Sequence, residues 1–113
     1  MAKVEITESL YAEINKTFKK ESIEVLHLIK SLENFPQKGK ILGTIGGIII
    51  KELKYNNFRF YFITDGFKLK CADQVQLIDL LLRFVRMSDK RYQQETINEI
   101  KHILRTIGVE GFK

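Results

Sequence analysis

The chain has 113 residues, with 19 Lys and Arg against 14 Asp and Glu, so its formal net charge is +5. This length suits a single compact domain over residues 1–113 and excludes two complete domains. Apolar residues make up 44% of the chain and charged residues 29%, a balance that supports a packed core and excludes disorder.

The cysteine and histidine content gives no sign of a disulfide or a metal site. Cys71 is the single cysteine, and the two histidines, His27 and His102, are too far apart for zinc spacing. No apolar run approaches the roughly 18 residues of a membrane-spanning helix, and the first residues lack the apolar core of a signal peptide. We therefore expect a cytoplasmic protein with no metal, no cofactor and no membrane contact.

The first third of the chain predicts two helices. After a short extended start at residues 4–7, apolar residues recur at helical spacing to about Lys20, with Thr7 or Ser9 as the N-cap. A second apolar stripe follows at once and ends near Pro36, which disfavours helix in the residue before it. We expect these helices to form an antiparallel hairpin.

A glycine-rich stretch follows. Residues 37–47 hold four glycines and show neither a helical nor an alternating pattern, so we expect a loop, and no nucleotide-binding glycine motif occurs in it. Residues 48–54 are β-branched at their start and predict a strand, and residues 55–57 predict the turn after it.

The next strand is predicted over residues 58–64, in which every second residue from Phe58 to Phe62 is Phe. Because strand side chains alternate between faces, we expect the Phe side chains to face the core. The side chains expected to point outward are Arg59, Tyr61 and Ile63. Residues 65–66, Asp-Gly, predict a hairpin turn, and residues 67–72 predict a returning strand.

The last part of the chain predicts a buried strand and a helix. Residues 76–86 are apolar at both odd and even positions, as is typical of a central strand covered on both faces. Ser88 or Asp89 can cap a final helix that ends near Gly108. The sequence therefore predicts an α+β domain with an N-terminal helix hairpin, an antiparallel sheet of about four strands and a C-terminal helix.

The positive charge is concentrated in the middle of the chain. Residues 36–70 hold seven cations and two anions, whereas the segments before and after are nearly balanced. Such clusters are typical either of a solvated surface or of a site for an anion such as a phosphate backbone. The clustered cations are Lys38, Lys40, Lys51, Lys54, Arg59, Arg83, Arg86, Lys90 and Arg91.

Three segments and the terminal helix together resemble a known family. The segments are Lys51-Glu52-Leu53-Lys54, Phe58-Arg59-Phe60-Tyr61-Phe62 and Arg83-Phe84-Val85-Arg86-Met87-Ser88-Asp89-Lys90. The chain resembles the RelE/ParE superfamily of toxins from type II toxin-antitoxin systems, and most closely its RelE- and HigB-like branch. The resemblance implies a RelE-like fold and a ribosome-associated ribonuclease that cuts mRNA and is silenced by a cognate antitoxin protein.

The resemblance also implies a set of site residues. Lys54, Arg59, Arg86 and Lys90 match positions where the family keeps basic residues, and Tyr92 lies near the family's functional aromatic residue at the start of the last helix. We therefore expect these five residues to be catalytic. Five further cations are expected to bind RNA: Lys38, Lys40, Lys51, Arg83 and Arg91.

The chemistry expected of this set rests on cations. Attack by a 2′-hydroxyl group requires a proton acceptor, positive charge on the phosphorane and a proton donor, and the chain offers no evident acid and histidine couple. Arg59 and Arg86 would hold the scissile phosphate with forked donors. Lys54 or Lys90 would accept the proton, because neighbouring cations lower the pKa of a lysine, and Tyr92 would stack on a base.

Strand alternation restricts the set further. Arg83 and Arg86 are three residues apart, so in a regular strand they point to opposite faces and only one can share a face with Arg59. We expect Arg86 to be that residue, since it precedes the last helix, whose N-terminus favours a phosphate.

Two other functions stay open. One is a ParE-like protein that binds a topoisomerase without cutting RNA, although the basic segment before the last helix favours the ribonuclease. The other is a relic of the fold that binds only RNA or an antitoxin, suggested by Met87, which stands where HigB-like members often carry a lysine.

Overall fold

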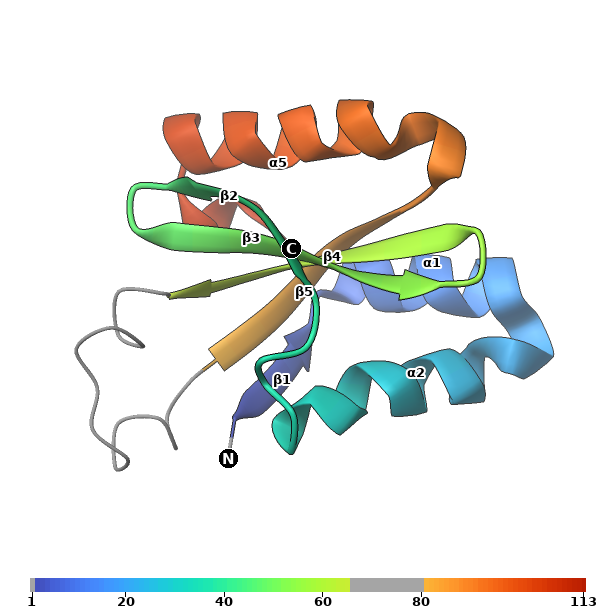
Figure 1. Ribbon diagram of the computed structural model, residues 1–113. Helices are drawn as coiled ribbons and strands as arrows, with labels where there is room; N and C mark the ends of the chain where they lie inside the picture. The colour runs from blue at the N-terminus through green and yellow to red at the C-terminus, as the bar shows by residue number, and fades with distance from the viewer. Residues whose placement is uncertain (1, 66–80) are drawn as a thin grey trace.

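The computed structural model describes residues 2–65 and 81–113. Five strands form one sheet in the order β1-β5-β4-β3-β2. The strands are β1 (Lys3–Ile6), β2 (Lys40–Ile45), β3 (Ile48–Tyr55), β4 (Phe58–Asp65) and β5 (Leu81–Asp89). Helices α1 (Glu8–Phe18) and α2 (Ser22–Lys30) lie on one face of the sheet, and α5 (Gln93–Thr106) lies on the other (Figure 1). None of these helices is long and apolar enough to cross a membrane.

The predicted α+β class is confirmed, whereas the predicted four-stranded antiparallel sheet is only partly correct. The sheet is mixed, because β1 pairs in parallel with β5 while the other neighbouring strands are antiparallel. This parallel pair joins the first strand of the chain to the last. Local patterns could not predict it, since the extended start at residues 4–7 carries no sign of its distant partner.

The predicted loop over residues 37–47 is wrong for Lys40–Ile45, which form the edge strand β2. A β-bulge between Ile41 and Gly43 breaks the alternation on which strand prediction depends. Gly46 and Gly47 form the turn to β3, and both have positive φ angles, which glycine adopts without strain. The strand predicted over residues 67–72 lies outside the described residues.

Both faces of the sheet are packed. Phe60, Phe62 and Phe84 face α1 and α2, as predicted for the alternating Phe side chains. Tyr61 and Ile63 pack beneath α5 and are buried, so the prediction that they point outward is wrong. The reason is that α5 folds back over the sheet and supplies Ile100 and Leu104 as a second apolar layer.

A β-bulge in β5 changes the direction of its arginine side chains. In the register with β4, Phe62 pairs with Phe84 and Tyr61 pairs with Arg86, so one residue of β5 is extra. Arg83 donates a hydrogen bond to the Phe112 carbonyl, and the guanidinium of Arg86 lies over the Phe112 ring. The two arginines therefore share the α5 side of the sheet, and the prediction that they point to opposite faces is wrong.

Candidate nucleic-acid interface

A concave surface with a volume of about 350 Å³ lies where β2 and β3 meet the start of α5. We call it the basic cleft. It contains three of the predicted site residues, Lys40, Lys90 and Arg91, which come from segments far apart in the sequence. The residues that line the basic cleft are Lys40, Leu42, Glu52, Lys90, Arg91, Gln93, Gln94 and Ile97.

The sheet register places two more predicted residues beside the basic cleft. Lys54 pairs directly with Arg59 across β3 and β4, and Lys54 shares a strand face with Glu52, which lines the cleft. The Nη1 atom of Arg59 donates hydrogen bonds to the Phe58 carbonyl at 3.1 Å and to the Asn56 carbonyl at 3.4 Å. These bonds hold the guanidinium at the β3–β4 turn, on the same face of the sheet as Lys54.

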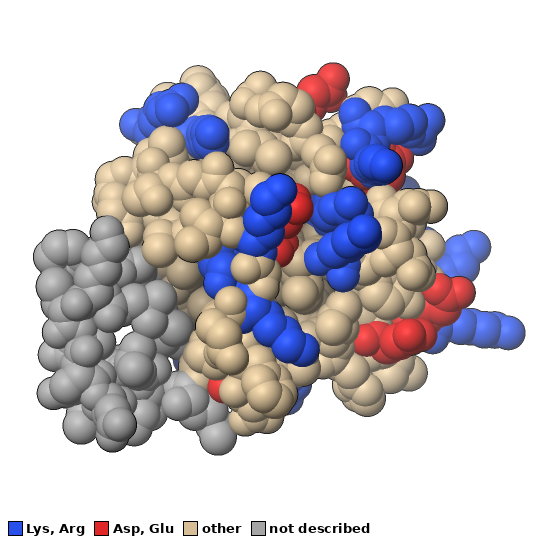
Figure 2. Space-filling model, in the orientation of Figure 1, with Lys and Arg blue, Asp and Glu red and all other residues tan. Residues whose placement is uncertain are grey.

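Figure 2 shows this side of the molecule. Lys and Arg side chains gather over the region where β2 and β3 lie in Figure 1, with a small acidic area among them. Glu52 is the carboxylate that lines the cleft, and it forms no ion pair with Lys54 or with any other residue of the described chain.

A buried hydroxyl pair lies close to these charges. The hydroxyl groups of Tyr61 and Ser88 are 2.8 Å apart, and Ser88 pairs in register with Arg59. Burial raises the pKa of Tyr61 above 10.0, the Ser88 hydrogen bond lowers it, Glu52 raises it and Arg59 lowers it. The charges of Glu52 and Arg59 therefore act on the Tyr61 hydroxyl in opposite directions. The hydrogen bond between Tyr61 and Ser88 also connects the end of β5 to β4.

The segment between β5 and α5 is a short 3-10 turn, Lys90–Tyr92, that Asp89 caps. The Asp89 carboxylate accepts hydrogen bonds from the Arg91 backbone N–H at 2.9 Å and from its Nη2 at 3.0 Å. These bonds from Arg91 lower the pKa of Asp89 below 3.8. The Arg91 guanidinium lies 5.4 Å from the Tyr92 ring centroid, and Tyr92 is 49% exposed. The cap thus fixes the side chains that this turn presents at the cleft.

Arg86 lies away from the basic cleft. Its Nε bonds to the Glu99 carboxylate, and its Nη1 donates to the Val85 carbonyl at 2.8 Å. Glu99 lies on a different flank of α5 from Gln94, which lines the cleft, so the helix separates Arg86 from the cleft. Every contact of Arg86 in the described structure is a packing or anchoring contact within the chain.

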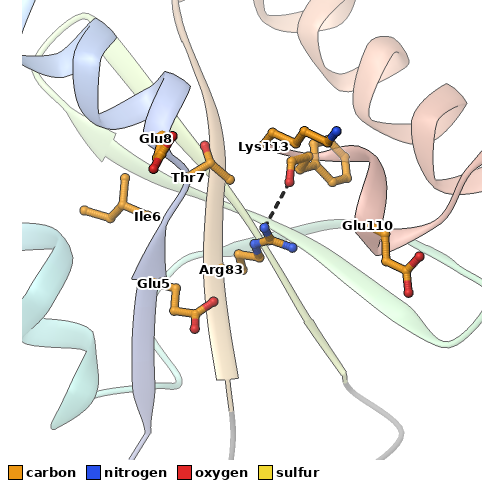
Figure 3. A pocket seen from close by; sticks show the side chains of 8 residues that line it. Glu5, Ile6, Thr7, Glu8, Arg83, Glu110 and Lys113 are labelled. Atoms are coloured by element: carbon orange, nitrogen blue, oxygen red, sulfur yellow. Dashed lines mark hydrogen bonds between the residues drawn. The ribbon is translucent and has the colours of Figure 1, made fainter.

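Arg83 belongs to a separate cavity of about 650 Å³ between β1 and the C-terminal residues (Figure 3). Its Nη1 donates to the Val109 carbonyl at 3.2 Å and its Nη2 to the Phe112 carbonyl at 2.9 Å. Three glutamates line the same cavity: Glu5, Glu8 and Glu110. Lys113 lines the cavity as well, so its three glutamates face two cations, and both terminal nitrogens of Arg83 already donate to backbone carbonyls. These contacts give Arg83 an anchoring role for the C-terminal residues.

Lys51 and Lys38 lie near each other but in different environments. Lys51 is only 8% exposed, and its Nζ donates to the Gln37 carbonyl at 3.2 Å on the face opposite the basic cleft. Desolvation lowers the pKa of Lys51 below 10.5. Lys38 is exposed, and its Nζ lies 5.1 Å from the centroid of the Phe35 ring.

The position of Met87 bears on the comparison with HigB-like proteins. Met87 is buried among the apolar residues under α1 and α2. A lysine here would have to place its charge in an apolar core, so this position could not serve an RNA site on the α5 face.

Several residues of the cleft were not singled out from the sequence. Gln93, Gln94 and Ile97 line it because α5 begins there, and Glu52 lines it because β3 directs even-numbered residues to this face. Alternation along β3 could have placed Glu52, whereas the glutamines carry no sequence signal.

No protein-family model, curated protein or solved structure matches the chain. Within residues 2–65 and 81–113, no group of three or more His, Cys, Asp or Glu side chains is placed to hold a metal ion. The chemistry available to the basic cleft is therefore argued from its own cations, amides and carboxylate.

Proposed function

We propose that the chain is a type II toxin that cuts mRNA on the ribosome, and that the basic cleft holds the phosphate at the cleaved bond. The supporting observation is that Lys40, Lys90 and Arg91 line one concavity although β2 and the segment before α5 are distant in sequence. Converging cations are what binding of a phosphodiester backbone requires.

The reacting phosphate would lie between the cleft and the paired residues Lys54 and Arg59. A phosphorane carries more negative charge than the starting diester, so fixed cations stabilise it selectively and accelerate the reaction. The Arg59 guanidinium has five N–H donors in a planar fork, and two carbonyls engage only its Nη1. Arg59 is thus the arginine best placed to grip the phosphate.

Attack of the 2′-oxygen on phosphorus would form a 2′,3′-cyclic phosphate and break the bond to the 5′-oxygen, so one group accepts the 2′-hydroxyl proton and a protonated group or water returns a proton to the 5′-oxygen. Two kinds of group can act as the acceptor. Lys54, which pairs with Arg59, and Lys90, which lines the cleft, are the amines of the proposal. The Glu52 carboxylate is the acidic group within the cleft and provides a second acceptor. The variants Lys54→Ala, Lys90→Ala and Glu52→Gln each remove one of these groups. The variant with the largest loss in cleavage rate identifies the proton acceptor.

The geometry narrows the catalytic set. Arg86 is paired with Glu99, Arg83 anchors the C-terminal residues and Lys51 is buried on the other face, so the proposal assigns them no contact with the scissile phosphate. Tyr92 remains in the set, because its half-exposed ring follows Arg91, which lines the cleft, and can stack on a base.

The test is cleavage of mRNA on purified ribosomes by the complete chain and by single variants. Arg59→Ala should slow cleavage at least tenfold, which corresponds to about 1.4 kcal/mol in the activation barrier. Arg105→Ala is the matched control, because this exposed arginine lies in the last turn of α5 at the end remote from the cleft. Equal rates for the wild type and Arg59→Ala would remove Arg59 from the site.

Conditional expression in cells separates this proposal from its alternatives. Cut messages with unchanged DNA supercoiling support the ribonuclease, whereas intact messages with altered supercoiling indicate a topoisomerase-binding toxin. Intact messages and unchanged supercoiling, together with retained binding to RNA or to a small neighbouring protein, indicate a relic of the fold.

A further inference from the structure

An exposed aromatic residue and a lysine form a small platform outside the basic cleft. The turn Phe35–Lys38, which we call the aromatic turn, closes with a hydrogen bond from the Lys38 N–H to the Phe35 carbonyl at 3.1 Å. Phe35 is 49% exposed, and the Lys38 ammonium lies 5.1 Å from its ring centroid. Pro36 occupies the second position of the turn, where its fixed φ angle favours this conformation.

The sheet holds the aromatic turn from beneath. The buried Lys51 ammonium donates to the carbonyl of Gln37, the third residue of the turn. The next residue, Gly39, has φ of 100°, and a Cβ atom added to it would lie 2.9 Å from the Phe62 ring. Burial of an ammonium group costs folding free energy unless the group is hydrogen-bonded. Here the Lys51 ammonium donates a hydrogen bond to the backbone of an exposed turn and holds it in place. Phe35 and Lys38 are therefore presented on a supported backbone.

The aromatic turn is close in the chain to the basic cleft. Lys40 follows it by two residues, begins β2 and lines the cleft. Arg91 also lines the cleft and, with Tyr92, forms a second pair of a cation and a half-exposed aromatic ring. The basic cleft is therefore adjacent in the chain to an exposed ring on each of two segments: Phe35 before Lys40, and Tyr92 after Arg91.

We propose that the aromatic turn is a second contact site for the RNA strand, at which a base stacks on Phe35 and a neighbouring phosphate binds Lys38. This inference rests on the proposed function for the identity of the RNA as substrate and deepens it by specifying single-stranded RNA on one side of the cleaved bond. Aromatic rings interleaved with cations bind single strands, whose bases expose a stacking face, whereas a duplex hides these faces. Lys51 is a positioning residue for this contact.

The absence of tryptophan from the sequence allows a direct test of stacking. In the full chain, Phe35→Trp introduces a single tryptophan at the aromatic turn, and Ile23→Trp introduces one at an exposed position of α2 as the matched control. A 2′-O-methyl RNA octanucleotide, which cannot be cut by its own 2′-hydroxyl group, should quench the tryptophan of the first variant and leave the second unchanged.

Affinity gives a second, independent measurement. Phe35→Ala should weaken binding of the octanucleotide about fivefold or more, the loss expected when one stacked base is released. We expect a dinucleotide to bind in the basic cleft alone, so its affinity should not change. Lys51→Met should produce the same selective loss with the circular dichroism spectrum retained, whereas a purely structural role would weaken both probes together.

The outcomes distinguish this inference from the proposed function. If wild-type protein cuts mRNA but Phe35→Ala binds the octanucleotide as tightly as wild type does, the aromatic turn is not an RNA contact and the ribonuclease proposal stands. If the octanucleotide quenches Phe35→Trp but no message is cut, the RNA contact stands and the ribonuclease proposal fails. Quenching by an acidic polyglutamate peptide and not by RNA, or no RNA binding by the wild type, would overturn the inference.

Discussion

Arg86 and Arg59 show how neighbours decide the role of a cation. Both belong to the family-like segments of the sequence, yet Arg86 meets a carboxylate and an aromatic ring, whereas Arg59 meets two backbone carbonyls. The Arg86 guanidinium is paired with Glu99 and its side chain is only 26% exposed, so it must give up that pair before it can bind a phosphate, whereas the Arg91 side chain, although paired with Asp89, is 79% exposed. We therefore assign Arg86 to the stability of the fold.

This assignment predicts that Arg86→Ala lowers the free energy of unfolding by about 1–3 kcal/mol, because it removes both the Glu99 pair and the contact with Phe112. Glu99→Gln should cost less, since Glu99 is half exposed. Urea denaturation of both variants and of the double variant measures the coupling. A coupling free energy of zero would show that the pair contributes nothing to stability.

Glu13 on α1 allows a prediction of pH dependence. Desolvation raises its pKa above 4.5, while the charge of Arg86 lowers it and that of Glu99 raises it. The folded state therefore disfavours the ionised carboxylate, a penalty that is complete above the folded pKa and absent below the unfolded pKa.

Glu13→Gln removes this penalty, so at pH 7 it should raise the free energy of unfolding. The gain should shrink as the pH falls through the raised folded pKa and should be smallest below 4.5. Thermal or urea unfolding as a function of pH measures it. A gain that instead grows as the pH falls would contradict the raised pKa.

At the level of the elements, the segment that joins α2 to β2 depends on one glycine. Gly39 has φ of 100°, and an added Cβ would lie 3.0 Å from the Glu52 carbonyl as well as close to Phe62. Gly39→Ala should therefore cost about 1–3 kcal/mol of stability through backbone strain. Gly46→Ala, in the β2–β3 turn, is the control for strain without crowding, since no atom lies within 4 Å of its added Cβ. Equal losses in urea denaturation would exclude crowding at Gly39.

The elements also show what could be predicted from the sequence. Helices α1, α2 and α5 and strands β3 and β4 follow from short-range patterns, because their periodicity is unbroken and Thr7 does act as the N-cap of α1. Strand β2 is not predicted, because its β-bulge interrupts the alternation of side chains and the glycines in and after it are typical of a loop. The parallel pairing of β1 does not follow from local patterns, because Lys3 to Ile6 pair with Leu81 to Phe84, which lie far from them in the sequence.

The candidate site was predictable to a similar extent. Alternation along each strand gives the faces of Lys54 and Arg59 only relative to their own neighbours, and the pairing of β3 with β4 is what puts both side chains on one face of the sheet. The burial of Lys51 and the internal pairing of Arg83 and Arg86 could not be predicted, because they follow from the bulge in β5 and from the packing of α5 and the C-terminal residues.

For the whole molecule, the separation of charge predicts a salt dependence of RNA binding. The basic cleft collects cations on one side of α5, while the cavity around Arg83 is lined by glutamates. Each phosphate contact with a single strand contributes about 0.7 to the slope of log affinity against log salt.

Lys40→Ala and Lys90→Ala should each reduce the magnitude of that slope by about 0.7, whereas Arg105→Ala should leave it unchanged. Fluorescence titrations with the uncleavable octanucleotide at several salt concentrations measure the slopes. If Arg105→Ala lowers the slope as much as the cleft variants do, the RNA is held by net charge and not by the cleft.

The extra residue in β5 has a consequence for how this protein can change over generations. Before the bulge, the even-numbered residue Phe84 faces α1 and α2. After it, the even-numbered residue Arg86 faces α5 and the odd-numbered residue Met87 enters the core under α1 and α2. Loss of the Val85 codon would leave Phe84, Arg86 and Met87 opposite the same residues of β4, so each of these side chains would stay on its present face and one buried valine would be lost. Deletion of this one residue should therefore survive selection more often than an insertion or deletion of one amino acid elsewhere in β5, which would exchange charged and apolar side chains between the faces of the sheet.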